Sequence, residues 1–155
     1  MQHTALDQVV PDFELPSTGD TVFRLSEQQG KNVVIYFYPK DNTPGCTLEG
    51  QNFRDHIDAF TTKDTIIVGV SRDSVRVHEG FKAKQNFPFE LLSDKEELTC
   101  KVFDVIQLKK NYGREYIGIV RSTFLIDKTG VLRQEWRNVK VKTHLEEVLD
   151  AVNAL

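Results

Sequence analysis

The sequence has few cysteines and no large excess of charge of either sign. Its two cysteines, Cys46 and Cys100, lie far apart in 155 residues, and the first residues lack the basic and apolar runs of an export signal. We therefore expect a cytoplasmic protein whose thiols are reactive or buried and form no structural disulfide. The net charge of -3 argues against a nucleic-acid-binding protein, because neutralising phosphates requires a basic surface.

Long apolar runs and common ligand-binding motifs are also missing. No apolar stretch approaches the roughly 18–20 residues that cross a membrane, so we expect no membrane partner. The 4 histidines and 2 cysteines show no metal-ligand spacing, and no glycine-rich nucleotide motif is present. The sequence therefore predicts neither a metal nor another cofactor.

What the sequence does contain is a succession of strand-like runs and helical patterns. Continuous β-branched and aromatic residues at 33–38 and 65–71 predict strands covered on both faces. We further expect an extended segment at 5–15, a hairpin around 17–25, strands at 90–92, 116–120, 122–126 and 131–136, a polar loop at 109–115, and helices at 44–60, from Asp73 or Ser74 to Gln85, from Ser93 onward and through His144 to Val152. This order predicts a single α/β domain over residues 1–155, with a mixed central β-sheet flanked by helices and an N-terminal β-hairpin.

Cys46 lies where the first long helix is expected to begin. Thr43 is a good N-cap residue and Pro44 a good first helical residue, so Cys46 would take the third helical position. Unpaired backbone N–H groups and the helix dipole at that position favour a thiolate, which is a nucleophile. The residues alone also fit a small buried apolar side chain, and they do not place the cation that would complete an activated thiol.

Two other thiol chemistries do not fit. Positions 43 and 49 are Thr43 and Glu49, so no C-x-x-C pair of the thioredoxin type includes Cys46. His56 is the only histidine on the expected helix, and about 15 Å of helical rise separates it from Cys46. A Cys–His pair on an unbroken helix is therefore excluded.

The segment around Cys46 carries a recognisable motif. Residues 38–49 read Tyr-Pro-Lys-Asp-Asn-Thr-Pro-Gly-Cys-Thr-Leu-Glu, and Pro39, Thr43 and Cys46 fit the pattern P-x-x-x-T-x-x-C. Further matches follow in order along nearly the whole chain: Pro11-Asp12-Phe13-x-Leu15-Pro16, Asn52-Phe53-Arg54-Asp55, Gly69-Val70-Ser71, Leu91-Leu92-Ser93-Asp94 and Arg121-Ser122-Thr123-Phe124-Leu125-Ile126-Asp127. Together they resemble the peroxiredoxins, and among them the bacterioferritin comigratory protein or peroxiredoxin Q branch.

The resemblance implies a thioredoxin-like fold and thiol-dependent reduction of hydrogen peroxide or organic hydroperoxides. Cys46 matches the peroxidatic cysteine, which becomes a sulfenic acid. Thr43 would hydrogen-bond the peroxide, Pro39 would shield the pocket from water, and Arg121 would be the missing cation. Each also has a plainer interpretation: an N-cap, a strand terminator and a solvated surface charge. Glu49 would orient the arginine or face water.

The resemblance leaves the second half of the reaction open. Many members of the branch carry a resolving cysteine at the position of Gln51 or of Lys82 here, and this sequence has neither. Cys100 is the one remaining candidate, and its place off the apolar stripe of its expected helix predicts an accessible thiol, although an inert small residue also fits. We expect a one-cysteine mechanism in a monomer, with thioredoxin, glutaredoxin or a small thiol as reductant. The alternative class is a non-catalytic redox sensor or holdase-like protein that uses Cys46 as a switch.

Overall fold

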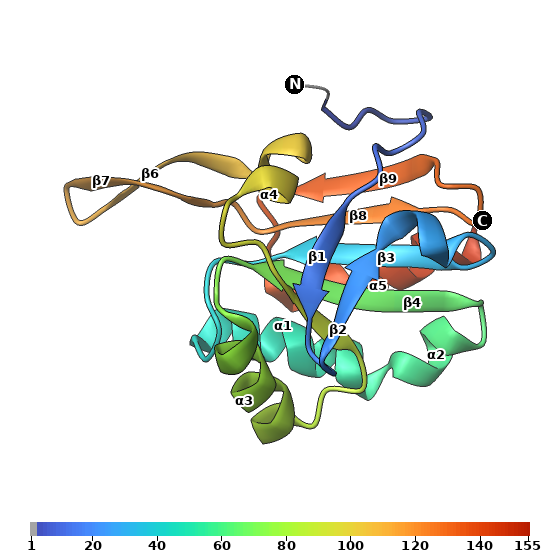
Figure 1. Ribbon diagram of the computed structural model, residues 1–155, viewed down its shortest axis with the longest axis horizontal. Coiled ribbons are helices and arrows are strands. Elements are labelled where there is room, and N and C mark those ends of the chain that lie inside the picture. The colour runs from blue at the N-terminus through green and yellow to red at the C-terminus, as the bar shows by residue number, and fades with distance from the viewer. Residues whose placement is uncertain (1–2) are drawn as a thin grey trace.

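The computed structural model describes residues 3–155, which fold into a mixed sheet covered by helices on both faces (Figure 1). The strands are β1 (Glu14–Ser17), β2 (Thr21–Arg24), β3 (Asn32–Phe37), β4 (Thr65–Ser71), β5 (Glu90–Ser93), β6 (Ile106–Asn111), β7 (Arg114–Ile119), β8 (Ser122–Ile126) and β9 (Leu132–Arg137). The α-helices are α1 (Pro44–Asp55), α2 (Ile57–Thr61), α3 (Val75–Gln85), α4 (Leu98–Val102) and α5 (Val141–Asn153). A short 3-10 helix covers Leu25–Gln28.

Seven strands form the central sheet in the order β2-β1-β5-β4-β3-β8-β9. Strands β3, β4 and β5 are parallel to one another, and the remaining pairs are antiparallel. The β1–β2 pair is the predicted N-terminal hairpin, with Leu15 opposite Phe23. The predicted mixed sheet and the N-terminal hairpin are therefore confirmed.

Strand β3 is buried on both faces, which explains its continuous apolar sequence. Val34 and Tyr36 point into the core under α1, α2, α3 and α5, whereas Ile35 and Phe37 point into the core that α4 and the N-terminal segment cover. Because successive strand residues alternate between faces, every position of such a strand must be apolar. The molecule thus has two cores, one on each face of the sheet.

The helix predicted over 44–60 is interrupted. It ends at Asp55, and His56, with φ -119 and ψ 17, separates it from α2. The His56 N–H bonds to the Phe53 carbonyl, three residues back, which tightens the last turn of α1. Phe53 and Phe60, on either side of this break, pack into the same core.

The prediction of a polar loop at 109–115 was wrong. These residues lie in a two-stranded antiparallel hairpin of β6 and β7 that projects from the body of the molecule (Figure 1). Tyr112 and Gly113 form its turn with φ values of 51 and 78. Two adjacent positive φ values are typical of the tight turns that match the twist of a hairpin. Strand β6 was missed because its side chains are mostly polar and exposed, whereas most of β7 lies within the strand predicted at 116–120.

The helix expected from Ser93 begins later, at Leu98, and is only 5 residues long. Glu97 has a left-handed backbone conformation with φ 63, so residues before Leu98 do not continue the helix. The helix α3 fits its prediction closely, because Ser74 caps it through a hydrogen bond from the Val77 N–H. No helix within residues 3–155 is both long enough and apolar enough to cross a membrane.

Candidate active site

Cys46 lies in the first turn of α1 and is 2% exposed. Thr43 occupies the N-cap position with an extended backbone, and Pro44 is the first helical residue, as predicted. The Thr43 side chain makes no capping bond, however. Its hydroxyl donates to the Lys40 carbonyl at 2.8 Å and so braces the loop before the helix. That donation leaves the Thr43 oxygen free only to accept a hydrogen bond from a bound molecule.

Arg121 supplies the cation that the sequence alone could not place. Its Nη2 donates to the Cys46 sulfur at 3.3 Å, and its Nη1 donates to Glu49 Oε1 at 2.6 Å. The side chain reaches the sulfur across Gly45, where an added Cβ would lie 3.1 Å from Nη2. A guanidinium hydrogen bond of this kind favours a thiolate over a thiol.

The sheet register explains how Arg121 comes to lie beside α1. Strand β8 pairs antiparallel with β3, and Ser122 lies opposite Phe37. Arg121 therefore stands beside the segment that leaves β3 and enters α1. This contact joins residues 75 positions apart in the chain.

Glu49 is buried one turn after Cys46 and is 2% exposed. Burial raises the pKa of its carboxyl group to about 7, although the charge and hydrogen bond of Arg121 act in the opposite direction. Its second oxygen, Oε2, is buried without a hydrogen-bond partner among residues 3–155. Burial lowers the pKa of Arg121, but the nearby Glu49 and Cys46 outweigh it and leave that pKa raised. Glu49 therefore faces Arg121 and not water.

We expect Glu49→Gln to change how stability depends on pH. The raised pKa keeps a proton on Glu49 up to about pH 7 in the folded chain, whereas the unfolded chain releases it near the ordinary glutamate pKa of 4.5. The folded state binds more protons in that window, so its free energy of unfolding falls as pH rises through it. Between pH 5 and 7.5, wild type should lose on the order of 2 kcal/mol relative to Glu49→Gln.

Urea unfolding of both proteins across this pH range measures the difference, because the two chains differ only at position 49. Parallel profiles would contradict the raised pKa of Glu49. Asp55→Asn, at an exposed position near the end of the same helix, is the matched control and should leave the slope unchanged.

Pro39 and Thr43 belong to the loop between β3 and α1, and both are partly buried. Pro39 and Arg121 line an open hollow of about 590 Å³. The structure thus joins Cys46 and Glu49 through hydrogen bonds from Arg121. Pro39 lines the same hollow as Arg121.

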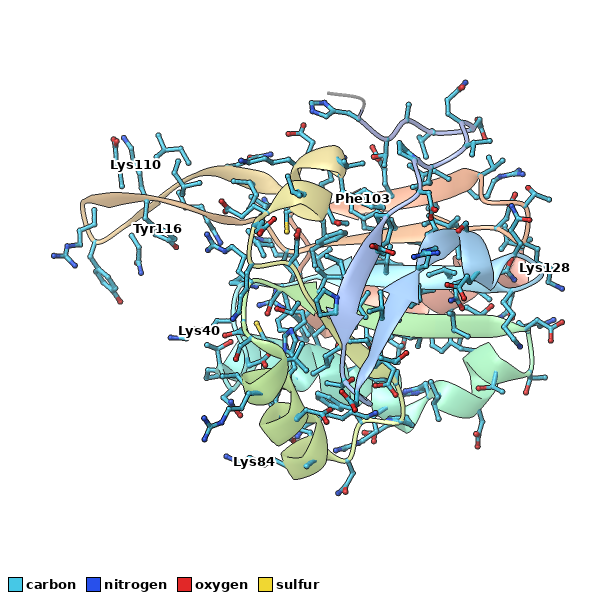
Figure 2. All side chains as sticks on the ribbon, in the orientation of Figure 1. Lys40, Lys84, Phe103, Lys110, Tyr116 and Lys128 are labelled. Atoms are coloured by element: carbon cyan, nitrogen blue, oxygen red, sulfur yellow. The ribbon has the colours of Figure 1, made fainter. Side chains whose placement is uncertain are left out.

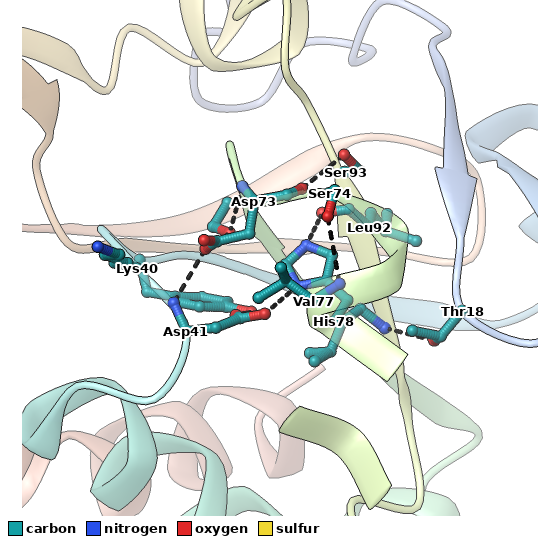
Figure 3. A network of polar contacts seen from close by, with 12 residues as sticks. Thr18, Lys40, Asp41, Asp73, Ser74, Val77, His78, Leu92 and Ser93 are labelled. Atoms are coloured by element: carbon teal, nitrogen blue, oxygen red, sulfur yellow. Dashed lines mark hydrogen bonds and ion pairs between the residues drawn. The ribbon is translucent and has the colours of Figure 1, made fainter. Parts of the chain in front are cut away.

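A buried polar network that the sequence did not reveal anchors this loop (Figure 3). Asp41 accepts from the Tyr38 hydroxyl at 2.6 Å and lies 2.6 Å from His78 Nδ1. The Asp41 N–H donates to Asp73 Oδ2 at 2.9 Å, and Ser71 donates to the same oxygen at 2.6 Å. The network therefore ties the loop to the end of β4 and to α3.

His78 is fully buried, and both of its ring nitrogens face acceptors. Nδ1 faces the Asp41 carboxylate, and Nε2 lies 2.9 Å from the Leu92 carbonyl. The ring therefore links the loop that carries Asp41 to strand β5. The ligand-type atoms of Asp41, Asp73 and His78 lie within 4.8 Å of one another, and these hydrogen bonds account for that cluster.

The prediction that Cys100 is accessible was wrong. Cys100 is 0% exposed and packs in the core on the opposite face of the sheet from Cys46. Its N–H donates to Asp94 at 2.7 Å. Burial, and then the charge of Asp94, raise the pKa of its thiol. The apolar pattern predicted the wrong buried side of this helix. In the structure α4 turns Thr99 and Cys100 inward and leaves Leu98 58% exposed.

Comparison with known proteins identifies the family of the chain. Residues 6–135 match the model of the AhpC/TSA family. The chain is 52% identical over 147 residues to peroxiredoxin Bcp of Bacillus subtilis, covering 95% of this chain and 94% of that protein. The chain belongs to the AhpC/TSA family and is a peroxiredoxin. It is also 46% identical to peroxiredoxin Bcp of Xanthomonas campestris, covering 99% of this chain and 98% of that protein.

Solved structures of peroxiredoxins have the same fold. The peroxiredoxin Q of Xylella fastidiosa superposes with a TM-score of 0.92 at 42% identity, covering 99% of this chain and 98% of that chain. The peroxiredoxin Q of Xanthomonas campestris superposes with a TM-score of 0.87 at 48% identity, covering 92% and 90%. The predicted thioredoxin-like fold and membership of the Bcp/peroxiredoxin Q branch are confirmed. A peroxiredoxin is a thiol peroxidase, which takes a hydroperoxide as substrate and a thiol as reductant.

Proposed function

We propose that Cys46 is the peroxidatic thiol of this peroxiredoxin. Its thiolate attacks the terminal oxygen of a hydroperoxide, a sulfur–oxygen bond forms and the O–O bond breaks. The leaving alkoxide or hydroxide takes a proton and departs as an alcohol or as water. Cys46 is left as a sulfenic acid, so the sulfur is oxidised by two electrons and the peroxide is reduced by two. The observation that carries this proposal is the Arg121 hydrogen bond to the Cys46 sulfur.

Arg121 would act in two states of this reaction. Before the attack, its guanidinium stabilises the thiolate, and during O–O cleavage it lies next to the oxygen on which negative charge develops. Donors fixed in advance beside developing charge are an effective means of lowering a barrier. Glu49 holds the guanidinium from the other side through Nη1, so it acts as a positioning residue.

Thr43 and Pro39 would shape the place where the peroxide binds. The Thr43 oxygen has its hydrogen committed to Lys40, so it is an acceptor for the O–H of a hydroperoxide. Pro39 carries no N–H and borders the hollow beside Arg121, which limits the water that reaches the guanidinium. The Asp41–His78 network would keep this loop in position.

We propose hydrogen peroxide and organic hydroperoxides as substrates. The bacterioferritin comigratory protein of Xanthomonas campestris, 47% identical to this chain, has alkyl peroxide reduction activity. The Thr43 acceptor and the Arg121 donor would contact only the oxygens of a bound peroxide. They would therefore serve either substrate.

We further propose a one-cysteine mechanism, in which an external thiol resolves the sulfenic acid. Cys100 is buried on the far face of the sheet, and a Cys46–Cys100 disulfide would require its two sulfurs to approach to about 2 Å. Burial also disfavours the thiolate form that Cys100 would need to attack. Gln51 and Lys82 occupy the two other positions at which related proteins carry a resolving cysteine.

The test is peroxide turnover with thioredoxin, glutaredoxin or a small thiol as reductant, in wild type and Cys100→Ala. Alanine is the better replacement because a serine hydroxyl would be buried at this site. We expect the variant to keep the wild-type turnover with each reductant to within about twofold. Loss of thioredoxin-supported turnover with an intact first oxidation would show instead that Cys100 resolves the sulfenic acid.

A further inference from the structure

The hollow beside Arg121 is lined by positive charge in a chain whose net charge is -3. Lys109, Arg121 and Arg137 line its wall, and no carboxylate side chain from residues 3–155 does. Its volume is about 590 Å³, which is enough for a small organic molecule. We call it the Lys109–Arg137 pocket.

Lys109 is held in place with little compensation for its charge. Its Nζ donates to the Ile119 carbonyl at 2.9 Å, a bond that fixes the ammonium without neutralising it. Burial, and then repulsion by Arg121, lower its pKa. An anion that binds between two neighbouring cations removes their mutual repulsion and is attracted by both, so its binding is electrostatically favourable.

Arg137 is fixed from a different element, the end of β9. Its Nη1 donates to the Asp104 carbonyl at 2.9 Å, and its guanidinium lies 5.1 Å from the centre of the Phe124 ring. Within residues 3–155 its ion-pair partner is Glu135, whose partly exposed carboxylate lies 3.5 Å from Nη2. The positive charge of Arg137 is therefore only weakly balanced.

Arg121 connects this pocket to the thiol. The same side chain that donates to the Cys46 sulfur also forms part of the pocket wall. The pocket lies at the base of the β6–β7 hairpin, since Lys109 is on β6 and Arg121 follows β7. A molecule bound there would contact Arg121, the side chain that also donates to the Cys46 sulfur.

We propose that the Lys109–Arg137 pocket binds the carboxylate of a small anionic thiol that reduces oxidised Cys46. This inference rests on the proposed function of Cys46. The thiolate of the reductant attacks the sulfenic sulfur, an S–S bond forms, the S–O bond breaks, and hydroxide leaves as water after taking a proton. A second thiol then attacks the reductant's sulfur in the mixed disulfide, which releases Cys46 as thiolate and the reductant as its own disulfide.

A thiol is the source of the carboxylate that the observations favour. The proposed one-cysteine mechanism needs an external thiol, and a small thiol has little apolar surface with which to bind. Ion pairs to fixed cations would supply its orientation. A hydroperoxide that bears a carboxylate would bind the same cations. The experiment must therefore separate oxidation of Cys46 by the peroxide from reduction of its sulfenic acid by the thiol.

The experiment oxidises the protein with one equivalent of peroxide and follows loss of the sulfenic acid by stopped flow. The probes are 3-mercaptopropionate, which is anionic, and 2-mercaptoethanol, which is neutral. In Lys109→Gln and in Arg137→Gln we expect the anionic-to-neutral rate ratio to fall about three- to tenfold at low salt. Lys109→Arg should restore the wild-type ratio, because it keeps the charge.

Lys110→Gln is the matched control. Lys110 is the next residue on β6, its side chain is 74% exposed, and it pairs with Glu115. Neighbouring strand residues point to opposite faces of the hairpin, and Figure 2 shows Lys110 and Tyr116, the strand partner of Lys109, on its two sides. We expect Lys110→Gln to leave the rate ratio unchanged.

Two results would overturn the inference. If Lys109→Gln and Arg137→Gln keep the wild-type ratio although sulfenic acid forms, the pocket does not bind the thiol. The oxidation step is tested with an alkyl hydroperoxide that bears a carboxylate and with its methyl ester. If Lys109→Gln and Arg137→Gln change only the ratio of these two oxidation rates, the pocket binds the peroxide and not the thiol. Failure to form any sulfenic acid would instead contradict the proposed function of Cys46.

Discussion

Cys46→Ser is expected to lower peroxide reduction by more than about 10³-fold, with hydrogen peroxide and with an alkyl hydroperoxide alike. Serine nearly preserves the size of the side chain but has no appreciable ionised form at neutral pH. The Arg121 guanidinium and the first turn of α1 would then face a neutral hydroxyl, which does not attack the O–O bond. The measurement is peroxide consumption at saturating reductant.

The control for this variant is structural integrity. Cys46 is buried beside Gly45 and Glu49, so serine should cost little packing, and thermal unfolding should stay cooperative. Cys100→Ala, which removes the only other thiol, should retain activity. If Cys46→Ser consumed peroxide within tenfold of wild type, the nucleophile would lie elsewhere.

Arg121→Gln is expected to lower kcat/KM for peroxide by about 10²–10³-fold. The variant loses the cation 3.3 Å from the Cys46 sulfur and with it the charge aimed at the departing oxygen. Glu49 also loses its ion-pair partner while it remains buried, so its proton will be held to a higher pH. The kcat/KM of Arg121→Lys should lie between those of wild type and Arg121→Gln. An ammonium keeps the positive charge but cannot donate to Cys46 and Glu49 with the planar geometry of a guanidinium.

A double variant separates the catalytic effect from a loss of stability. Arg121→Gln leaves a buried carboxyl group without its partner, which destabilises the fold. Glu49→Gln in the same chain removes that group, so the double variant should regain most of the lost stability but none of the lost rate. Recovery of the rate together with the stability would mean that Arg121 has only a structural role.

The local features of this fold could be predicted from the sequence because each depends on neighbouring residues. The run 33–38 has the apolar pattern of a strand buried on both faces, and it forms β3. Thr43 and Pro44 predicted the start of α1 correctly, which placed Cys46 in its first turn. The contact with Arg121 depends on the pairing of β3 with β8, and the resemblance to peroxiredoxins, not any local pattern, pointed to it.

The errors have a physical cause as well. The helix α4 is so short that its apolar pattern did not fix which side faces the core, and Cys100 was placed on the wrong side. Strand β6 buries little and was predicted in part as a polar loop, although the strand predicted at 116–120 covers most of its partner β7. The Asp41–His78 pair joins residues 37 positions apart, and only the helical spacing of His78 and Phe81 hinted that His78 faces inward.

The most direct test of Cys46 as the peroxidatic residue is the site of first oxidation. Reductant-free Cys100→Ala protein receives one equivalent of hydrogen peroxide in the presence of a nucleophile specific for sulfenic acids, and the digested peptides are weighed by mass spectrometry. We predict that the peptide containing Cys46 is labelled in nearly all molecules, and that labelling drops sharply in the same background with Arg121→Gln. An unlabelled Cys46 peptide while peroxide is still consumed would contradict the account.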